Sequence, residues 1–461
     1  MSMTHTDLTQ GPIFKQLVKL SLPIMATSFM QMAYNLTDMV WIGRVGSGAV
    51  AAVGTAGFFV WFGNALHFST KIGAEVNVSQ SLGRRDMDAA AGYGRSSFRL
   101  AVFLAAVYGL FLVAGAKALM GFFDLGVDNG FDVTAASIQY LRIIGAGSVF
   151  MFVNPTLTGI YNGLGNSRLP FLFNAVGLVI NMIMDPVLIF GFGPFPALGV
   201  RGAAIATILS QLTVFFLFIH SFHRNRIIAL KELFKKARSR RMANVLKIGM
   251  PPAMQNMLFA FFAMIIAKIL SGWGPIPIAV QKVGSQIEAL SWLTAGGIAT
   301  SLGAFVGQNY GAKDLYRIKQ GYKTAMGIMG VFGLAATGLL VFAGEPIFRI
   351  FIHEAHVIPE GVLYLKILGY SQLFMAVEIT TAGAFNGMGK TLPPALTGII
   401  FTGLRIPAAL ILTGTSLDVA GVWWSVSGSS IVKGTLLVFL FIPYISHFRF
   451  RKGRPKAPPL S

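Results

Sequence analysis

The sequence predicts an all-α polytopic membrane protein with twelve transmembrane helices in two six-helix halves, related by a pseudo-twofold axis along the membrane normal. Hydrophobic residues make up 54% of the 461 positions, and only 12% are Asp, Glu, Lys or Arg, about half the roughly 25% typical of soluble domains. The apolar residues form continuous runs that reach the roughly 20 residues a spanning helix needs, unlike the alternating segments of about 10 residues in a membrane β-barrel. Several motifs also repeat at a spacing near 228.

Continuous apolar runs separated by polar or glycine-rich turns define the twelve predicted helices. The first run follows a polar start and is too long for the apolar region of a signal peptide, so we expect it to be a membrane span. The predicted helices cover residues 14–42, 49–76, 93–120, 134–162, 168–192, 199–222, 245–270, 276–304, 320–344, 360–386, 391–413 and 419–446.

Basic residues define the expected orientation, because cytoplasmic loops are enriched in Lys and Arg. The predicted loops after the second, sixth and eighth helices and the C-terminal tail are basic, whereas the loops on the opposite side are mostly acidic. Both termini are therefore expected to be cytoplasmic. The net charge of +20, from 37 basic and 17 acidic residues, follows from this topology, so we expect a lipid bilayer and no nucleic acid as partner.

The repeated motifs divide the chain into two halves. Gln80–Asp86 is matched by Gln308–Asp314, and Asn162–Gly165 is matched by Asn386–Gly389. An even number of helices per half makes the repeats parallel, an arrangement of transporters that alternate access by rocking one half against the other. The predicted parts are an N-terminal six-helix lobe (1–222), a basic cytoplasmic linker (223–243), a C-terminal six-helix lobe (244–446) and a basic cytoplasmic tail (447–461).

Asp38 and Asp185 are the main candidates for chemistry inside the membrane, where an ionised side chain needs a partner or a purpose. A rise of 1.5 Å per residue places Asp38 roughly 35 Å from Lys15 and Asp185 roughly 25 Å from Arg168, both beyond the midplane. Two carboxyl groups at one depth can share protons or hold a cation such as Na⁺. Asn181 lies four residues before Asp185, on the same helical face. A purely structural pair is the alternative interpretation.

Two prolines predict hinges beside these acids. Pro186 directly follows Asp185, and Pro23 lies about four turns before Asp38 in the first helix. A proline inside a helix removes one backbone hydrogen bond and favours a bend. We therefore expect the first helix to bend when protonation of the acids changes.

The second half lacks this acid pair and carries other charges. The position 228 after Asp38 is Ile266. The charges expected within the membrane form either internal ion pairs, with the glutamates as acceptors, or a substrate or second cation site. These residues are Lys268, Lys282, Glu288, Glu378, Arg405 and Lys433.

Composition also excludes several functions. The chain has 7 His and no Cys, so disulfides, cysteine-ligated metals and thiol nucleophiles are excluded. No Gly-x₄-Gly-Lys-Ser/Thr motif is present, which disfavours direct use of ATP. We expect no cofactor and no enzymatic activity, and transport driven by an ion gradient.

Three segments resemble the multidrug and toxic compound extrusion (MATE) transporters. Asn181–Phe190, followed by Gly199–Thr207, is similar to the signature of their fifth and sixth helices. Tyr34–Asp38 resembles their first-helix motif, and Asn162–Ser167 resembles their fourth-to-fifth turn. The resemblance covers essentially the whole chain and is strongest to the branch related to DNA-damage-inducible protein F.

The resemblance implies an antiporter in a prokaryotic cell (inner) membrane that exports amphipathic, often cationic drugs in exchange for H⁺ or Na⁺. In that branch the acid pair handles the coupling ion, a role that carries over to Asp38, Asn181 and Asp185 and extends to Tyr140 and Thr207. Tyr140 as an interfacial aromatic and Thr207 as a backbone-bonded hydroxyl are the alternatives. Paired carboxyl groups favour H⁺ over Na⁺, and a monomer is expected.

Adaptable Met and Phe side chains are the expected lining of a substrate cavity, with packing or lipid contact as the alternative for each. The candidates are Met25, Phe29, Met32, Met184, Gln255, Met257, Phe261, Glu288, Phe374 and Glu378.

Two other functions stay open at this stage. A lipid-linked oligosaccharide flippase of the same superfamily would use a cationic cavity, for which Arg142, Lys268 and Arg405 are candidates. An intramembrane aspartyl protease would use Asp38 and Asp185 as a dyad, but the second aspartate lacks the Gly-x-Gly-Asp context of that family.

Overall fold

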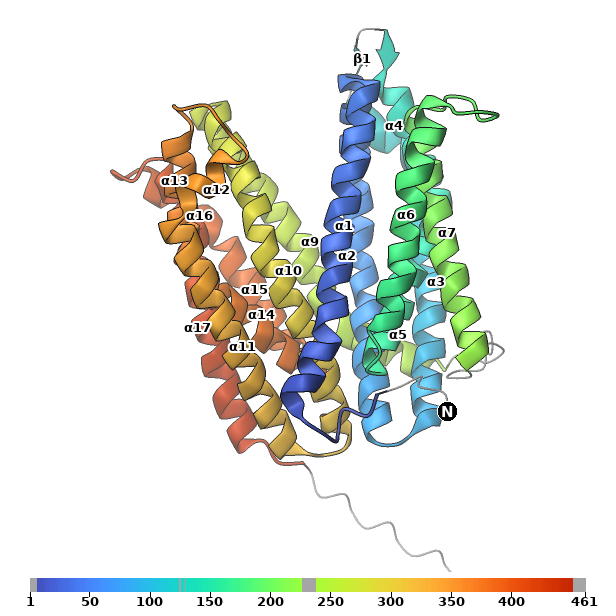
Figure 1. The fold of residues 1–461 in the computed structure, drawn as a ribbon, viewed down its shortest axis with the longest axis vertical. Coiled ribbons are helices and arrows are strands. Elements are labelled where there is room, and N and C mark those ends of the chain that lie inside the picture. The colour runs from blue at the N-terminus through green and yellow to red at the C-terminus, as the bar shows by residue number, and fades with distance from the viewer. Residues whose placement is uncertain (1–5, 124–125, 129, 226–237, 451–461) are drawn as a thin grey trace, which may run out of the picture.

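The computed structural model describes residues 6–123, 126–128, 130–225 and 238–450. The central part of the predicted linker (226–237) and the end of the predicted tail (451–461) lie outside the described residues. The helices form two bundles that meet at the end where the chain begins and diverge toward the other end (Figure 1). We call the end that carries the chain termini the terminal face and the opposite end the distal face.

The N-terminal lobe contains seven described helices and a small antiparallel hairpin at the distal face. The hairpin is formed by β1 (Val127–Asp128) and β2 (Phe131–Asp132). The helices are α1 (Ile13–Val45), α2 (Ser47–Gly83), α3 (Met87–Gly121), α4 (Val133–Ala146), α5 (Ser148–Gly163), α6 (Arg168–Phe190) and α7 (Val200–Asn225).

The C-terminal lobe begins with α9, so helical structure extends a few residues into both ends of the predicted linker 223–243. Its elements are α9 (Ser239–Leu270), the 3₁₀ turn η1 (Ser271–Trp273), α10 (Pro275–Gly311), α11 (Leu315–Phe342), α12 (Gly344–Arg349), α13 (Ile358–Gly369), α14 (Gln372–Gly387), α15 (Leu392–Gly403), α16 (Arg405–Thr413) and α17 (Ala420–His447).

The described helices account for the twelve predicted spans. Nine spans, with α15 and α16 counted as one, are long and apolar enough to cross a bilayer. Two further spans are bent pairs, α4–α5 by 48° and α13–α14 by 46°. The twelfth is α1, which has 33 residues but is less hydrophobic over a membrane-spanning length than those nine spans. The all-α two-lobe fold class is confirmed.

The two bent spans correct the prediction of continuous helices at 134–162 and 360–386. The first breaks at Gly147, where an added Cβ would lie 2.1 Å from Ile208 Cδ1, so glycine permits close packing of α7 at the break. The second breaks at Tyr370 and Ser371, and the Ser371 hydroxyl donates to the Leu368 carbonyl at 2.8 Å. Hydropathy does not reveal either break, because the residues on both sides are apolar.

The repeated motifs adopt the same local structure in both lobes. Arg85 and Lys313 follow α2 and α10, and both have left-handed backbone angles, with φ of 59° and 61°. Asp86 and Asp314 then cap α3 and α11 by accepting the backbone N–H three residues later, at 2.8 and 2.9 Å. The sequence repeat is therefore a repeat of helix-end geometry.

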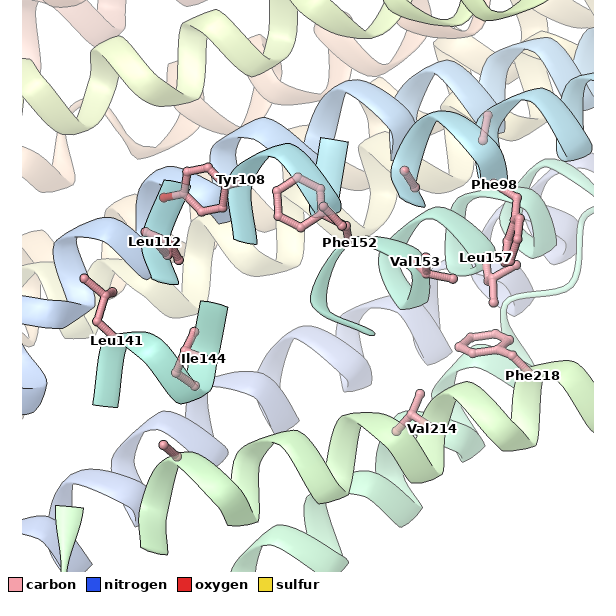
Figure 2. Close-up of a cluster of buried hydrophobic side chains, with 14 of the residues drawn as sticks. Phe98, Tyr108, Leu112, Leu141, Ile144, Phe152, Val153, Leu157, Val214 and Phe218 are labelled. Atoms are coloured by element: carbon pink, nitrogen blue, oxygen red, sulfur yellow. The ribbon is translucent and has the colours of Figure 1, made fainter. Parts of the chain in front are cut away.

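The core of the N-terminal lobe lies where α3, α4, α5 and α7 meet (Figure 2). Its interlocking aromatic and branched side chains make the lobe one packed unit. Large apolar side chains on the outer surface, such as Leu110, Val331 and Phe439, are about 70% exposed, as expected for helix faces that contact lipid. The core residues include Phe98, Tyr108, Leu112, Leu141, Ile144, Phe152, Val153, Leu157, Val214 and Phe218.

Candidate functional site

Asp38 of α1 and Asp185 of α6 lie side by side in the distal half of the N-terminal lobe. Their carboxyl groups lie close enough to interact directly with each other. Asp185 is fully buried and Asp38 is partly buried. A carboxylate has no proton to donate, so two neighbouring carboxyl groups can bond to each other only when one of them holds a proton. The two helices thus bring together two acids that can share one proton.

The polar residues expected around the acids surround them in the structure. Asn181 Nδ2 donates to Asp185 Oδ1 at 3.2 Å, across one turn of α6. Tyr140 of α4 is buried and lies close enough to interact electrostatically with both carboxyl groups. Thr207 of α7 is buried and accepts a hydrogen bond from the Tyr34 hydroxyl at 2.9 Å.

Tyr34 is a member of this cluster to which the sequence analysis gave no role. It lies four residues before Asp38, hence on the same face of α1, and it also interacts electrostatically with Asp38 and Asp185. The four-residue spacing within the Tyr34–Asp38 motif could have identified Tyr34 as a neighbour of Asp38. We call Tyr34, Asp38, Tyr140, Asn181, Asp185 and Thr207 the acid-pair cluster.

The acid-pair cluster is rich in acceptor atoms and poor in cations. Among the described residues, Asn181 Oδ1, Asp38 Oδ1 and Asp185 Oδ2 are buried acceptor atoms without a hydrogen-bond partner. The described residues contain no group of three or more His, Cys, Asp or Glu side chains that could hold a metal ion. Such a site is suited to a proton or a monovalent cation and lacks the dense oxygen cage of a divalent-metal site.

The two predicted hinge prolines lie inside helices that continue through them. Pro23 lies in the first third of α1, and its carbonyl accepts the Thr27 hydroxyl at 2.9 Å. Pro186 lies in the last third of α6, directly after Asp185. Each removes one backbone N–H from its helix. Their role as hinges stays a prediction.

The candidate cavity residues are distributed over both lobes. Met25 of α1 packs against Gly297 of α10 in the other lobe, and Gln255 of α9 packs against Gly398 of α15. Phe261 is 51% exposed. Phe29, Met32, Met184, Met257 and Phe374 are partly buried.

A charged cluster occupies the C-terminal lobe, and its two glutamates are among the cavity candidates. Lys433 Nζ lies 3.2 Å from Glu378 Oε1 in a buried ion pair, which confirms the prediction of internal pairing for these two residues. Arg405 donates from Nε to Ser429 Oγ at 2.6 Å and from Nη2 to Ser430 Oγ at 3.1 Å. Arg405 also interacts electrostatically with Glu288 and Glu378. Glu288 is hydrogen-bonded to Tyr364.

Two lysines that were expected to lie within the membrane have exposed side chains. Lys268 is in the last turn of α9, and Lys282 lies two turns into α10. Both side chains are close to the distal ends of their helices, where long cationic side chains reach water. Arg142 of α4 is exposed as well. Arg405 is hydrogen-bonded to two serines, whereas Lys268 and Arg142 are exposed. The three cations proposed for a flippase cavity are therefore in different environments.

The sequence analysis missed three polar residues inside α2. His67, Lys71 and Glu75 follow one another at intervals of four residues, the spacing of one helical face. Glu75 forms a hydrogen bond with Asn162 and interacts with Lys71. An added Cβ at Gly303 would lie 3.5 Å from Glu75 Oε1, so this acid faces α10 of the other lobe. Their regular spacing within the predicted helix 49–76 was the available signal.

At the terminal face the two repeats bind each other across the lobes. Gln80 Nε2 donates to the Gly387 carbonyl at 3.0 Å, and the equivalent Gln308 Nε2 donates to the Gly163 carbonyl at 3.1 Å. The backbones also approach closely, because an added Cβ at Gly83 would lie 1.8 Å from the Gln308 carbonyl oxygen. These reciprocal contacts close the terminal face.

The N-terminal segment reinforces this closure. The Thr6 N–H donates to the Leu164 carbonyl of the N-terminal lobe at 3.0 Å. The Leu8 N–H donates to Gln308 Oε1 of the C-terminal lobe at 2.8 Å, and Leu8 itself is only 2% exposed. The segment is therefore inserted between the lobes at the face where they meet.

Comparison with known proteins places this fold in a family. The MatE family profile matches residues 23–187 and 251–411, one segment in each lobe. The probable multidrug resistance protein NorM of Thermotoga maritima is 27% identical over 437 residues, which cover 93% of this chain and 92% of that protein. A FAD transporter of Shewanella oneidensis is 26% identical and covers 82% of this chain and 83% of that protein.

Solved structures share the whole fold. One is described as the outward-facing conformation of a multidrug resistance MATE family transporter of the MOP superfamily. It aligns with a TM-score of 0.85 at 22% identity and covers 97% of this chain and 99% of the other. The family profile spans most of the chain, so the protein belongs to the multidrug and toxic compound extrusion family, whose members are membrane transporters and not enzymes.

Proposed function

We propose that the chain is a multidrug efflux antiporter that exports amphipathic, often cationic compounds in exchange for H⁺. The carrying observation is the close approach of the Asp38 and Asp185 carboxyl groups, which supports a proton shared between α1 and α6. The name of the Thermotoga maritima relative supports drug export. Assignment to the branch related to DNA-damage-inducible protein F and a monomeric state belong to the same proposal.

Electrostatics explain how this pair exchanges a proton for a cation. Two neighbouring carboxylates repel each other in an apolar environment, so loss of the shared proton destabilises the contact between α1 and α6. A bound cation removes the same repulsion. Proton and cationic substrate therefore compete for one negative site, and each favours a different arrangement of α1.

The proposed orientation places the terminal face in the cytoplasm of a prokaryotic cell. Positive loops favour the cytoplasmic side, and the described terminal face carries Arg84, Arg85, Lys313 and Lys319. The lobes diverge toward the distal face, and Asp38 lies about 10 Å from the distal end of α1, at 1.5 Å per residue. In this arrangement the acid pair is accessible to external protons.

The test is efflux of a lipophilic cation such as ethidium from proteoliposomes that contain the full chain. We expect transport that follows an imposed pH gradient and is insensitive to Na⁺. Asp38→Asn and Asp185→Asn should each abolish the gradient-driven component, because both remove a titratable group at nearly constant volume. Asp88→Asn, at an exposed acid in the first turn of α3, is the matched control and should transport like the parent.

Transport that ignores the pH gradient and follows Na⁺ contradicts proton coupling and assigns the pair to Na⁺. Parental drug efflux by Asp38→Asn, with normal amounts of folded protein, contradicts the role of the acid pair itself. Turnover of a lipid-linked oligosaccharide without drug efflux favours the flippase function instead.

A further inference from the structure

A basic cavity of about 520 Å³ opens at the terminal face between α3 of the N-terminal lobe and the start of α9 of the C-terminal lobe. Four cations line it, and none of its described lining residues is a carboxylate. The lining residues that bear polar side chains are Tyr93, Arg238, Arg240, Arg241, Asn244 and Lys247. We call this cavity the basic cavity.

The start of α9, a helix of 32 residues, concentrates positive charge. Helix N-termini carry a partial positive charge and are stabilised by acidic residues. Here the first turn has no acidic residue, Arg238 at the N-cap makes no side-chain cap bond, and Arg240 and Arg241 follow at once. The helix end and the side chains all add positive charge to one space, and an anion in that space would offset their repulsion.

The walls of the basic cavity are positioned by contacts between the lobes. The Arg241 guanidinium lies over the Tyr93 ring, 5.5 Å from its centroid. Asn244 Nδ2 donates to Asn77 Oδ1 at 2.7 Å and to the Tyr93 hydroxyl at 3.3 Å. Asn77 and Tyr93 belong to the N-terminal lobe, whereas Asn244 and Arg241 belong to the C-terminal lobe.

Close packing fixes the relative position of the two helices here. A Cβ added at Gly73 of α2 would lie 2.4 Å from the Val245 carbonyl oxygen, and one added at Gly249 of α9 would lie 1.7 Å from the Ser69 carbonyl oxygen. The basic cavity therefore has this shape only while the lobes are closed at the terminal face. Rocking α9 away from α2 and α3 would separate its two walls.

We propose that the basic cavity binds a phosphate-bearing anion, the headgroup of an anionic phospholipid or free phosphate, and that the bound anion stabilises the arrangement closed at the terminal face. Guanidinium groups bind phosphate oxygens in a two-point geometry. Basic clusters beside membrane helices attract anionic lipids. The inference does not depend on the assignment of the coupling ion, because it concerns binding and the position of the lobes.

The binding test measures the unfolding midpoint of the full chain in detergent while phosphatidylglycerol, phosphatidylcholine or inorganic phosphate is added. We expect phosphatidylglycerol to raise the midpoint and phosphatidylcholine to leave it unchanged. Arg240→Gln/Lys247→Gln removes two exposed cations of the cavity. It should weaken the apparent affinity about 30-fold, from about fivefold for each cation.

The matched control is Lys319→Gln/Lys323→Gln, which removes two exposed cations of α11 outside the cavity. It should keep the parental response. Stabilisation by inorganic phosphate as well as lipid identifies a free anion as ligand, and stabilisation by lipid alone identifies a membrane headgroup. No response to either, or equal loss in both double variants, overturns the proposal.

The proposed stabilisation of the arrangement closed at the terminal face is tested by measuring distances between the lobes at the distal face. The chain has no Cys, so spin labels can be placed at two exposed distal positions, Phe192 and Phe342. Phosphatidylglycerol should increase the population with widely separated labels in the parent background and not in Arg240→Gln/Lys247→Gln. Lipid binding without any shift in that population contradicts the proposed stabilisation.

Discussion

The acid-pair cluster of the N-terminal lobe and the charged cluster of the C-terminal lobe occupy equivalent halves but differ in charge balance. The first holds two acids that lie beside each other, and no described cation forms an ion pair with them. The second combines Glu288 and Glu378 with Arg405 and Lys433, two negative and two positive groups. The described residues place no cation of the protein in an ion pair with the N-terminal acids, whereas Glu378 of the C-terminal lobe is paired with Lys433.

The difference arises at a few equivalent positions on a shared backbone. Tyr34 and Asp38 of α1 correspond, 228 residues later, to Phe262 and Ile266 of α9. Ile266 is 3% exposed within an apolar cluster. Exchange of a few side chains therefore distinguishes a buried acid pair from an apolar, packed region.

The largest expected effect is a difference in the free energy of unfolding between variants of the two clusters. Glu378→Gln leaves Lys433 as a buried, unpaired cation, which should lower the free energy of unfolding by about 3–5 kcal/mol. Asp185→Asn should change it far less, because the neutral side chain can still bond to Asp38. Unfolding midpoints in detergent measure both.

Glu378→Gln/Lys433→Met provides the control for this prediction. Removing both charges should restore most of the lost stability, since a buried pair contributes little net stability. A single variant that is as stable as the parent would show that Glu378 is not held by the ion pair and would remove the contrast between the lobes.

The next largest effect is expected at the terminal face, where equivalent substitutions in the two lobes should have similar consequences. Gly83→Ala and Gly311→Ala each place a Cβ about 2 Å from a backbone carbonyl oxygen of the opposite lobe. The overlap should destabilise the arrangement closed at the terminal face by about 1–3 kcal/mol. It should therefore shift the spin-label distances between positions 192 and 342 toward shorter values.

Gly327→Ala is the control, because an added Cβ there has open space. Similar shifts in the two terminal-face variants support the equivalence of the repeats. A shift in only one of them would show that closure is carried by one half.

The smallest effect converts one N-terminal position to its C-terminal counterpart. Tyr34→Phe removes the hydrogen bond to Thr207, worth about 0.5–1.5 kcal/mol. It should lower pH-gradient-driven efflux about two- to tenfold and alter its pH profile. Tyr316→Phe, at a 71% exposed tyrosine, should change neither, and an unchanged profile for Tyr34→Phe would exclude Tyr34 from the coupling site.

The sequence by itself determined the fold class, the two lobes and the motifs that repeat at helix ends. These features depend on hydropathy over about 20 residues and on the residue types at helix ends. Both are properties of contiguous residues. Asp38, Asn181 and Asp185 were also identifiable, because charged groups are rare within apolar runs.

Only the tertiary structure decided which of these groups meet. The close packing at the Gly147 break and the basic cavity depend on contacts between residues far apart in the chain. Asp38 and Asp185 are separated by 147 positions, and no local pattern states that their carboxyl groups lie side by side. Charge pairing is a property of helix packing, so only the tertiary structure decided that Glu378 is paired with a lysine and that Asp38 lies beside another acid.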